Sequence, residues 1–509
     1  MAKTKTPSFV LELELSLNPH ERKLVKKKLN IGRQIYNACL GEALKRLHKI
    51  QNDKNYQISL VSLKKLNSEI NSFKNKKLSK EQRNLLKQLN IQKTSLQSEL
   101  KDIELSYGYS EYQLHAWSVK CRQHFKGQIG ASEIQKLATR AFQAIEKLRY
   151  HKAERVYFKK YDELISIENK SNKQGLRWKD GKVLWGKLAL DVVISKKDVY
   201  AQEALKSKIK YIRIVPKVIR GKERFYVQFI QEGYPPVKKY KMIGPTNERV
   251  GIDPGTSTMS ITSKTFVSIE ELAPEIAVDE KKLRRIQRAM DRSRRTTNPQ
   301  NFNTDGTVIK GRKIWKQSNR YKKLAAKRKE LYRKITAKRK LSHETLANKI
   351  IAIGLDVRVE KMNYKGLQRK AKQITTNKKN GKINKKKRFG KSLSNRAPSM
   401  FLSILERKLN YYGQELKKAD TKSLKASQFN HKTGEYNKKE LSERWMMIDG
   451  KKVQRDLYSS FLIANTNDEL DAVDIDQANS WYDKFLELHD IEVDRLKQSN
   501  IKTLKWYVK

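Results

Sequence analysis

Cysteine is almost missing from this chain, which has only Cys39 and Cys121 in 509 residues. Neither belongs to a CxxC pair, so the sequence argues against a disulfide framework and favours a reducing cytoplasm. Long apolar runs are missing as well: no stretch is long enough to span a bilayer, and residues 1–7 do not read as a signal peptide. We therefore expect a cytoplasmic protein with no membrane partner.

Acidic residues are scarce relative to basic ones. The chain has 54 Asp and Glu against 112 Lys and Arg, a net charge of +58. A compact chain with this excess repels itself unless a polyanion neutralises it. Nucleic acid is therefore the expected partner, and binding should weaken steeply as salt rises. The preference for lysine over arginine and the frequent asparagine fit an AT-rich bacterial genome. We expect a bacterial protein that is associated with the nucleoid.

Hydrophobic periodicity divides the first half of the chain into one strand, several helices and two hairpins. Residues 9–17 alternate as a strand, and helical patterns extend from there to about Tyr161. They include a hairpin of two helices, separated by a capping-box signal at residues 78–82, and a helix over residues 137–157.

Short turn signals then mark β structure. Asp180-Gly181 separates two short strand-like runs, and residues 220–222 separate two longer ones. Residues 234–236, Tyr-Pro-Pro, read as a linker into a further domain. In the second half we expect strands over residues 250–261 and 355–360. Helices are expected over 281–295, 319–351, 394–412 and 457–464, a lysine-dense segment over 370–391, and an acidic helical tail over 465–494.

Three carboxylates occupy positions that a metal-dependent nuclease needs. Asp253 follows a buried strand and precedes a glycine turn, Glu360 ends a strand, and Asp456 opens an apolar helix. Two strand ends and a helix start can converge on one face of a sheet. Acids that meet there repel one another unless divalent cations lie between them. Two such ions clamp an in-line phosphodiester displacement.

The order and spacing of these motifs resemble the TnpB family of transposon-encoded RNA-guided nucleases and their relatives, the miniature type V CRISPR effectors. The resemblance covers most of the chain. It rests on residues 158–162, the two hairpins, and residues 250–255, 284–295, 318–323, 359–367 and 455–456.

The resemblance implies a multidomain α+β protein. It contains an RNase H-like RuvC nuclease domain, a mixed sheet with helices, and a β-barrel wedge domain interrupted by a helical recognition domain. The first strand then pairs with strands after Gly175. The implied boundaries are 1–18 and 162–246 for the wedge, 19–161 for the recognition domain, 247–415 and 454–470 for RuvC with a basic helical insertion at 281–350, 416–453 for a degenerate target-nucleic-acid-loading segment, and 471–509 for a helical tail.

The implied activity is that of an RNA-guided DNA endonuclease with one RuvC site. Asp253, Glu360 and Asp456 are then both the catalytic residues and the ligands of two Mg²⁺ ions, with Mn²⁺ as an alternative. The partners are a guide RNA, either an omega RNA or a CRISPR RNA, and double-stranded target DNA, which forms an RNA–DNA heteroduplex. The protein itself reads a short motif beside the target. The segment 370–391 is interpreted as a lid over the heteroduplex. A monomer is favoured over an oligomer.

The chain departs from the family pattern between Glu360 and Asp456. Most members carry a zinc ribbon there, but residues 427–447 contain no cysteine, and one histidine cannot hold a tetrahedral zinc. We predict no structural zinc and expect packing around Phe429, Tyr436, Leu441 and Trp445 instead. In the last motif, Gln454 replaces an acid and Tyr458 replaces an asparagine. These changes place the rate of cleavage in question.

Each acid also has a simpler reading. Asp253 fits an ordinary turn residue or the phosphate loop of an actin-like ATPase, although no second phosphate loop is found. Glu360 fits a solvated strand end, and Asp456 fits a helix N-cap. The lysine-rich helices fit solvated faces, and the aromatics among them, Trp315, Tyr321 and Tyr332, fit either packing or base stacking. His115, His124 and His151 receive no catalytic role.

Two other functions remain open from the sequence. One is an RNA-guided DNA-binding repressor with little or no cleavage, and the other is a plain RNA-binding protein. The long helical hairpin favours a CRISPR-like or intermediate member, but the sequence does not decide between a transposon and a CRISPR guide.

Overall fold

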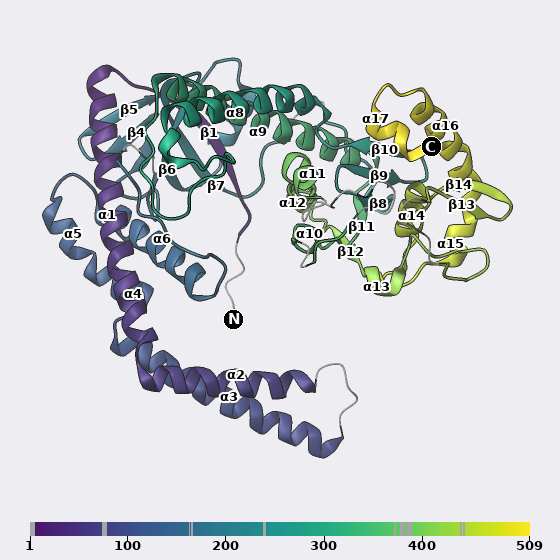
Figure 1. Cartoon of the computed structure of the whole chain (residues 1–509), viewed down its shortest axis with the longest axis horizontal. Helices are drawn as coiled ribbons and strands as arrows, with labels where there is room; N and C mark the ends of the chain where they lie inside the picture. Colours follow the sequence, from purple (N-terminus) through teal and green to yellow (C-terminus); the bar gives the residue numbers. More distant parts are fainter. Residues whose placement is uncertain are drawn as a thin grey trace. The chain divides into compact units, whose positions relative to one another are not determined.

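The chain folds into two compact units, Met1–Pro236 and Val237–Lys509 (Figure 1). The computed structural model describes residues 6–73, 79–161, 163, 166–237, 241–370, 373–376, 381, 383, 389–437, 440 and 443–508. The boundary between the units falls at the predicted Tyr-Pro-Pro linker. Both units combine helices with a sheet, so the α+β, multidomain character expected from the sequence is confirmed.

The first unit contains one seven-stranded antiparallel sheet and a set of helices. Its elements are β1 (Ser8–Ser16), α1 (Pro19–Gln51), α2 (Lys54–Ser72), α3 (Lys80–Ser106), α4 (Glu111–Trp117), α5 (Val119–His124), α6 (Ala131–Arg149), β2 (Ile167–Glu168), β3 (Arg177–Lys179), β4 (Lys182–Trp185), β5 (Leu188–Val192), α7 (Val199–Leu205), β6 (Ile209–Ile219) and β7 (Lys222–Glu232).

The sheet has the strand order β2-β6-β7-β1-β5-β4-β3. β1 pairs with β7 and, at its end, with β5, which confirms the predicted pairing of the first strand with strands after Gly175. Asp180-Gly181 and Arg220-Gly221 turn the two hairpins with positive φ at both residues, as their turn chemistry predicts. Trp178 on the β3 edge packs against Phe229 on β7. The ladders among the described residues leave β2 and β3 as edges, so closure into a barrel is not confirmed.

The helices of the first unit share one hydrophobic core with the sheet. Leu40 of α1, Ala141 of α6 and Phe229 of β7 are all fully buried in it. α2 and α3 form the predicted helical hairpin, and Ser79 begins α3 with a capping box (Figure 1). The helix predicted over residues 137–157 is wrong at both ends, because α6 covers Ala131–Arg149. His151 adopts a positive φ of 51°, which no helix continues.

The second unit is built on a five-stranded mixed sheet. Its elements are β8 (Arg249–Pro254), β9 (Thr258–Thr262), β10 (Val267–Glu271), η1 (Pro274–Ile276), α8 (Ala277–Thr297), η2 (Pro299–Asn301), α9 (Asn319–Ile353), β11 (Asp356–Glu360), α10 (Tyr364–Leu367), α11 (Gly390–Arg396), α12 (Pro398–Asn410), β12 (Lys417–Ala419), α13 (Thr421–Leu424), β13 (Trp445–Ile448), β14 (Lys451–Gln454), α14 (Arg455–Ala464), α15 (Ile475–Ser480), α16 (Tyr482–Gln498), α17 (Lys502–Lys505) and η3 (Trp506–Val508).

The strand order β10-β9-β8-β11-β12 joins three antiparallel strands to two parallel ones. The long basic helices α8 and α9 confirm the two helices predicted between β10 and β11, while the single helix expected over residues 394–412 is wrong. It divides into α11 and α12 because Ala397 between them has a left-handed φ of 46°.

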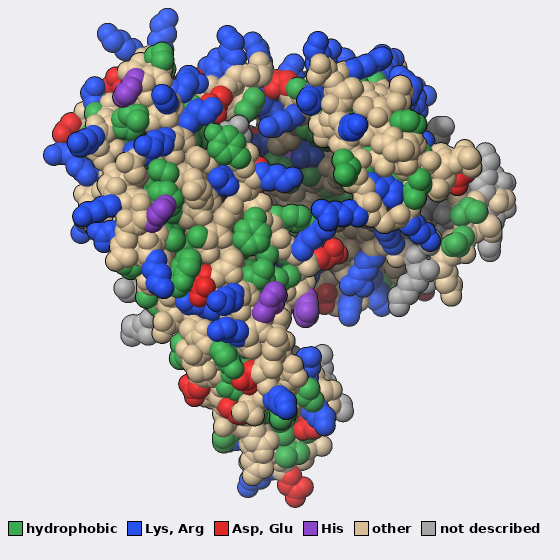
Figure 2. Space-filling model, turned by 60° about the vertical axis from the view of Figure 1, so that its left-hand side comes forward, with side chains coloured by type: hydrophobic (Ala, Val, Ile, Leu, Met, Phe, Trp, Pro, Cys, Tyr) green, Lys and Arg blue, Asp and Glu red, His purple; other side chains and the backbone are tan. Residues whose placement is uncertain are grey.

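Positive charge dominates the surface. Lys and Arg side chains far outnumber Asp and Glu on the face in Figure 2. None of the helices in the described part of the chain combines the length and apolar character needed to cross a membrane.

Candidate functional site

The sheet of the second unit places Asp253 and Glu360 side by side. β8 and β11 run parallel, with Val359 paired to Ile252, so Glu360 and Asp253 are the next residues on their strands. Strands in a sheet lie about 5 Å apart, and side chains two positions apart point to the same face. Gly251 lies two residues before Asp253 and faces α14, because a Cβ there would overlap backbone atoms of Ser460 and Ala464. Asp253 and Glu360 therefore both face the α14 side of the sheet.

α14 brings the third carboxylate to the same face. Asp456 is the one residue of this helix that is only partly buried. It lies one turn before Ser460, which packs on Gly251, so it lies toward the end of β8 where Asp253 is located. Asp456 is not the helix N-cap, and that reading is corrected: Gln454 caps the helix, its side-chain oxygen accepting the Leu457 N–H at 2.8 Å.

The three acids interact electrostatically. The pKa of Asp253 is raised well above its usual value, first by burial and then by the negative charges of Glu360 and Asp456. The hydroxyl of Ser459 and the charge of Arg455 oppose this rise. Burial raises the pKa of Glu360 to about 7. Carboxylates gathered in this way repel one another when ionised, and a divalent cation between them would relieve that repulsion.

Asp456 is surrounded by cationic and polar partners. Its Oδ2 accepts a hydrogen bond from Arg444 at 3.0 Å and from the amide of Gln454 at 3.1 Å. Its Oδ1 lies 3.4 Å from a guanidinium nitrogen of Arg455. Gln454 therefore has two structural roles, because it caps α14 and orients Asp456.

Carboxylate oxygens are the ligands that Mg²⁺ prefers, so the donor chemistry of Asp253, Glu360 and Asp456 fits this ion. The three carboxylates do not form a complete metal site in this structure. Among the side chains that the structure describes, no group of three His, Cys, Asp or Glu residues is placed to coordinate one metal ion. Arg444 and Arg455 now supply positive charge at Asp456. Coordination of a cation by Asp456 would therefore require a rearrangement at this side chain.

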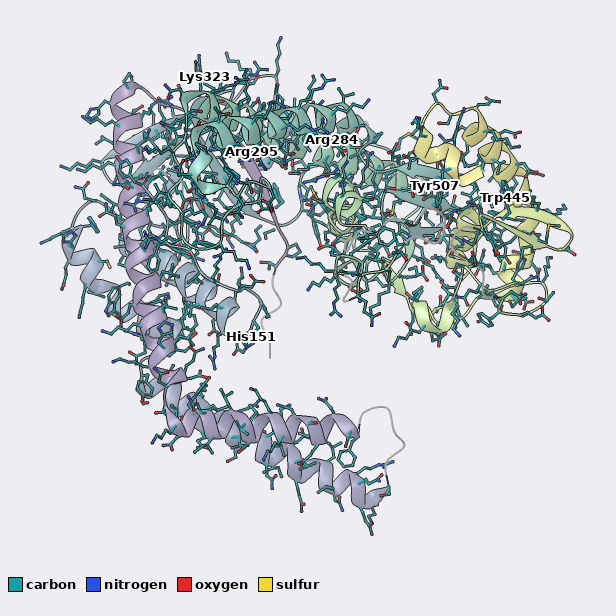
Figure 3. The ribbon with its side chains drawn as sticks, in the orientation of Figure 1. His151, Arg284, Arg295, Lys323, Trp445 and Tyr507 are labelled. Atoms are coloured by element: carbon teal, nitrogen blue, oxygen red, sulfur yellow. The ribbon has the colours of Figure 1, made fainter. Side chains whose placement is uncertain are left out.

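Two tyrosines border the acids. Burial and the charge of Asp253 raise the pKa of Tyr364, whose buried hydroxyl has no hydrogen-bond partner in the described structure. Tyr507 bonds Thr258 at 2.5 Å between hydroxyl oxygens, and burial together with Asp456 and Asp253 raises its pKa. Figure 3 labels Tyr507 and Trp445 in the C-terminal part of this unit.

Sequence reasoning missed Arg444, the Trp506 ring on which its guanidinium stacks, Tyr507 and the hydroxyl of Ser459. The first lies in a loop before a short strand, and the next two lie some fifty residues beyond Asp456. No periodicity or turn signal connects them to the carboxylates. Ser459, three residues after Asp456, was predictable from helix spacing.

The segment around residues 427–447, which has no cysteine, contains a buried histidine. His431 is 2% exposed and packs among the rings of Tyr458, Phe461 and Tyr482. Phe429 is buried against the same core, as expected, while Tyr436 is half exposed and contacts the Phe429 ring. The sheet residues buried beside Trp445 are Met446 and Ile448. Leu441, also expected in this core, lies outside the described residues.

The basic helices α8 and α9 pack against each other, and Arg284, Arg295 and Lys323 lie along them (Figure 3). Trp315 stacks on Arg294 at 4.1 Å and contacts Phe302, so it packs within the protein.

The predicted lid over residues 370–391 falls largely outside the described residues. His115 bonds Thr139.

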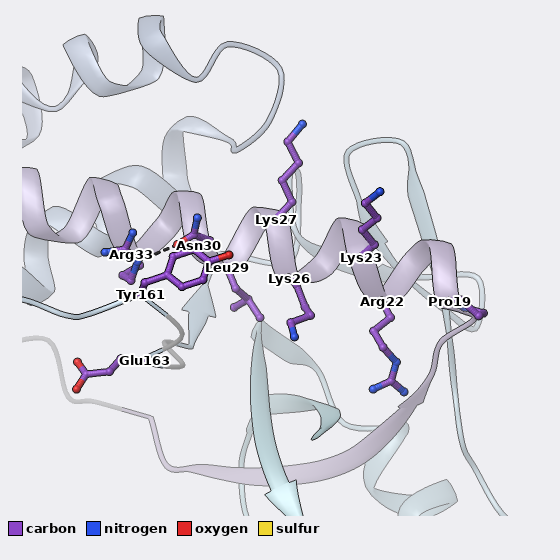
Figure 4. A pocket seen from close by; sticks show the side chains of 10 residues that line it. All are labelled: Pro19, Arg22, Lys23, Lys26, Lys27, Leu29, Asn30, Arg33, Tyr161 and Glu163. Atoms are coloured by element: carbon purple, nitrogen blue, oxygen red, sulfur yellow. Dashed lines mark hydrogen bonds between the residues drawn. The ribbon is translucent and has the colours of Figure 1, made fainter. Parts of the chain in front are cut away.

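A basic groove lies on α1 in the first unit (Figure 4). Its volume is about 470 Å³. Arg33 lies over the ring of Tyr161, which is 74% exposed, and bonds Asn30 and the carbonyl of Lys159. The groove is lined by Pro19, Arg22, Lys23, Lys26, Lys27, Leu29, Asn30, Arg33, Tyr161 and Glu163.

Comparison with known proteins gives distant structural likenesses. No protein-family model matches the chain, and no curated protein matches it. The structure of a Cas12f1-sgRNA-target DNA complex aligns with a TM-score of 0.42 at 12% identity, over 90% of this chain and 99% of the other. A CRISPR-Cas12f ternary complex aligns with a TM-score of 0.25 at 14% identity over the same shares. TM-scores this low do not by themselves establish a shared fold.

Proposed function

We propose that the chain is an RNA-guided DNA endonuclease whose single RuvC-type site is formed by Asp253, Glu360 and Asp456. The observation that carries the proposal is the convergence of these acids on one face of a mixed parallel sheet. The net charge of +58 attracts a polyanion such as nucleic acid to the surface that carries this site. The likeness of the sequence motifs to TnpB nucleases and miniature type V CRISPR effectors defines the substrate class.

When bound, two divalent cations would neutralise the carboxylates and supply the activation of water and the stabilisation of a leaving 3′ oxygen. Asp253 and Glu360 are the first candidate ligands because the sheet fixes their backbones side by side. Asp456 joins them from α14. Gln454 orients Asp456, and the half-buried Tyr364 and Tyr507, both close enough to sense the charge of Asp253, would limit access of water to it.

The basic surfaces are assigned to the nucleic acids. The groove on α1 contacts phosphates of the guide RNA, and α8 and α9 line the path of the RNA–DNA heteroduplex, held through its backbone. Base pairing between the guide and the target strand reads the sequence, and the protein reads a short motif that flanks it.

The test starts from the ribonucleoprotein purified from cells that carry the coding sequence with its flanking DNA, so that the copurified RNA can be sequenced. Plasmid with a target matched to that RNA should be cleaved in Mg²⁺ by the wild-type complex. Asp253→Asn should bind the plasmid and not cleave it. Asp449→Asn is the matched control, because Asp449 is exposed with a φ of 51° that asparagine also adopts. Cleavage by Asp253→Asn at the wild-type rate would exclude the assigned site.

A second candidate is an RNA-guided repressor without cleavage. The ion pairs of Asp456 with Arg444 and Arg455 favour it, because they hold one carboxylate away from a metal ion. Guide-dependent retention of a matched duplex, with no cleavage in Mg²⁺ or Mn²⁺, would support this candidate. Retention of RNA alone would support a plain RNA-binding protein.

A further inference from the structure

Arg444 connects the carboxylate centre to the segment near residue 506. Its side chain is largely buried, 11% exposed, and one guanidinium nitrogen bonds Asp456 Oδ2 at 3.0 Å. The guanidinium carbon lies 3.5 Å from the centre of the Trp506 ring and 5.4 Å from that of Tyr507. A single side chain therefore makes an ion pair on one side and an aromatic stack on the other.

The backbone fixes this arrangement. β13 and β14 form a hairpin in which Trp445 pairs with Gln454, and the N–H of Arg455 bonds the carbonyl of Arg444 at 2.8 Å. Arg444 is thus the residue directly across the hairpin from the start of α14. On the other side, the carbonyl of Tyr507 accepts from the amide of Gln454 at 3.4 Å, which ties η3 to the same helix start.

Arg444 and a divalent cation compete for Asp456 Oδ2, while Oδ1 lies 3.4 Å from Arg455. A magnesium ion lies about 2.0–2.1 Å from a carboxylate oxygen. The dication would therefore approach a guanidinium that sits 3.0 Å from the same oxygen, and the two positive charges repel strongly in this poorly solvated site. A cation that coordinates Oδ2 would therefore have to displace Arg444, and the cost of displacement includes loss of the Trp506 stack.

We propose that Arg444 and Trp506 form a latch on the carboxylate centre, and that divalent-cation binding requires the latch to open. The inference rests on the proposed function and deepens it by naming the residues that set cation affinity. Arg444 is a positioning residue here: it acts through Asp456. Opening frees a cationic side chain beside the centre and leaves Asp456 with its contacts to Gln454 and Arg455.

The test measures cation binding and not cleavage. Mn²⁺ is added to the purified full-length chain, and free Mn²⁺ is counted by electron paramagnetic resonance. Trp506→Ala should raise the affinity for Mn²⁺ about threefold to tenfold, because a cation–π contact stabilises Arg444 in the closed position. Trp506 is 47% exposed, so its loss leaves the core intact. Arg444→Gln should raise the affinity further.

Matched variants separate the possible outcomes. Trp315→Ala removes a comparable stack on Arg294, in a loop away from the acids, and should leave Mn²⁺ affinity unchanged. Asp253→Asn should weaken binding at least tenfold. If Asp253→Asn loses Mn²⁺ while Trp506→Ala and Arg444→Gln bind it as wild type does, the latch is wrong and the proposed function stands. If Asp253→Asn binds Mn²⁺ like the wild type, the carboxylate centre and the latch both fail.

Discussion

The hydroxyl of Tyr458 lies 2.6 Å from Nδ1 of His431. The same hydroxyl oxygen accepts the backbone N–H of His431 at 3.1 Å. Because burial lowers the pKa of His431 to about 4, its ring is neutral near pH 7, so Tyr458 donates to Nδ1. Tyr458 thus anchors the lone histidine of residues 427–447. We interpret this pair as the contact that fixes the segment around His431 to α14.

Removing the hydroxyl should destabilise the second unit. Tyr458→Phe leaves the buried His431 nitrogen and N–H without their partner, which costs about 1–3 kcal/mol. Urea denaturation followed by tryptophan emission should show a lower midpoint. Tyr436→Phe is the control. Because Tyr436 is half exposed, this substitution should leave the midpoint unchanged. Equal midpoints for the two variants would show that the pair does not anchor the segment.

His431 should also make stability fall in acid. Its pKa is lowered in the folded protein, so the unfolded chain binds the proton first as the pH decreases below about 6.5. The contribution is fully present above that pH and is lost progressively toward pH 4, by about 3 kcal/mol in total. In His431→Asn the difference between urea midpoints at pH 7.5 and pH 5 should shrink. An unchanged difference would assign the acid sensitivity to other groups, such as the buried His489, whose pKa is also lowered by burial.

Local chemistry made much of the fold predictable. Asp180-Gly181 and Arg220-Gly221 set their hairpins because positive φ at both residues matches the twist of the strands. The capping box at Ser79 predicted the start of α3, because the side chains of Ser79 and Gln82 each accept the other residue's backbone N–H. The ends of β8 and β11 followed from runs of apolar residues that stop at an acid. Signals of this kind act within a few residues.

What was missed depends on contacts distant in sequence. Aspartate is a preferred N-cap, yet Gln454 takes that place because the strand β14 ends there and its N–H is fixed by a bond to His489 at 2.9 Å. The pairing of Arg444 with Asp456 and Trp506 needs a hairpin, a helix and η3 to meet. No pattern along the chain encodes such a meeting, because each partner has an ordinary local context.

Gly251 should be intolerant of any side chain. Gly251→Ala places a Cβ into backbone atoms of Ser460 and Ala464, which a change of rotamer cannot relieve, so α14 has to move. We expect a loss of about 3 kcal/mol or more in stability of the second unit, with Asp456 displaced from Asp253. Denaturation midpoints measure the first effect and Mn²⁺ binding the second.

The control for this prediction is Gly41→Ala in α1. The added Cβ there meets the Phe158 ring at an ordinary 3.7 Å, and alanine favours a helix over glycine by about 1 kcal/mol. Gly41→Ala should therefore be neutral or stabilising. Similar midpoints for the two variants would mean that α14 does not pack on β8 as closely as described.

The groove on α1 should contribute to RNA affinity through charge alone. Lys23 and Lys27 are exposed on α1, and Figure 4 shows both side chains extending from the helix. Replacing both by alanine removes two phosphate contacts, which should reduce the slope of log affinity against log salt by about 1.4 for single-stranded RNA. Binding of the copurified guide, measured at several salt concentrations, gives the slope. Lys196→Ala with Lys197→Ala removes the same charge from an exposed loop. If the loop variant reduces the slope as much, the effect comes from net charge, and the groove is not a phosphate site.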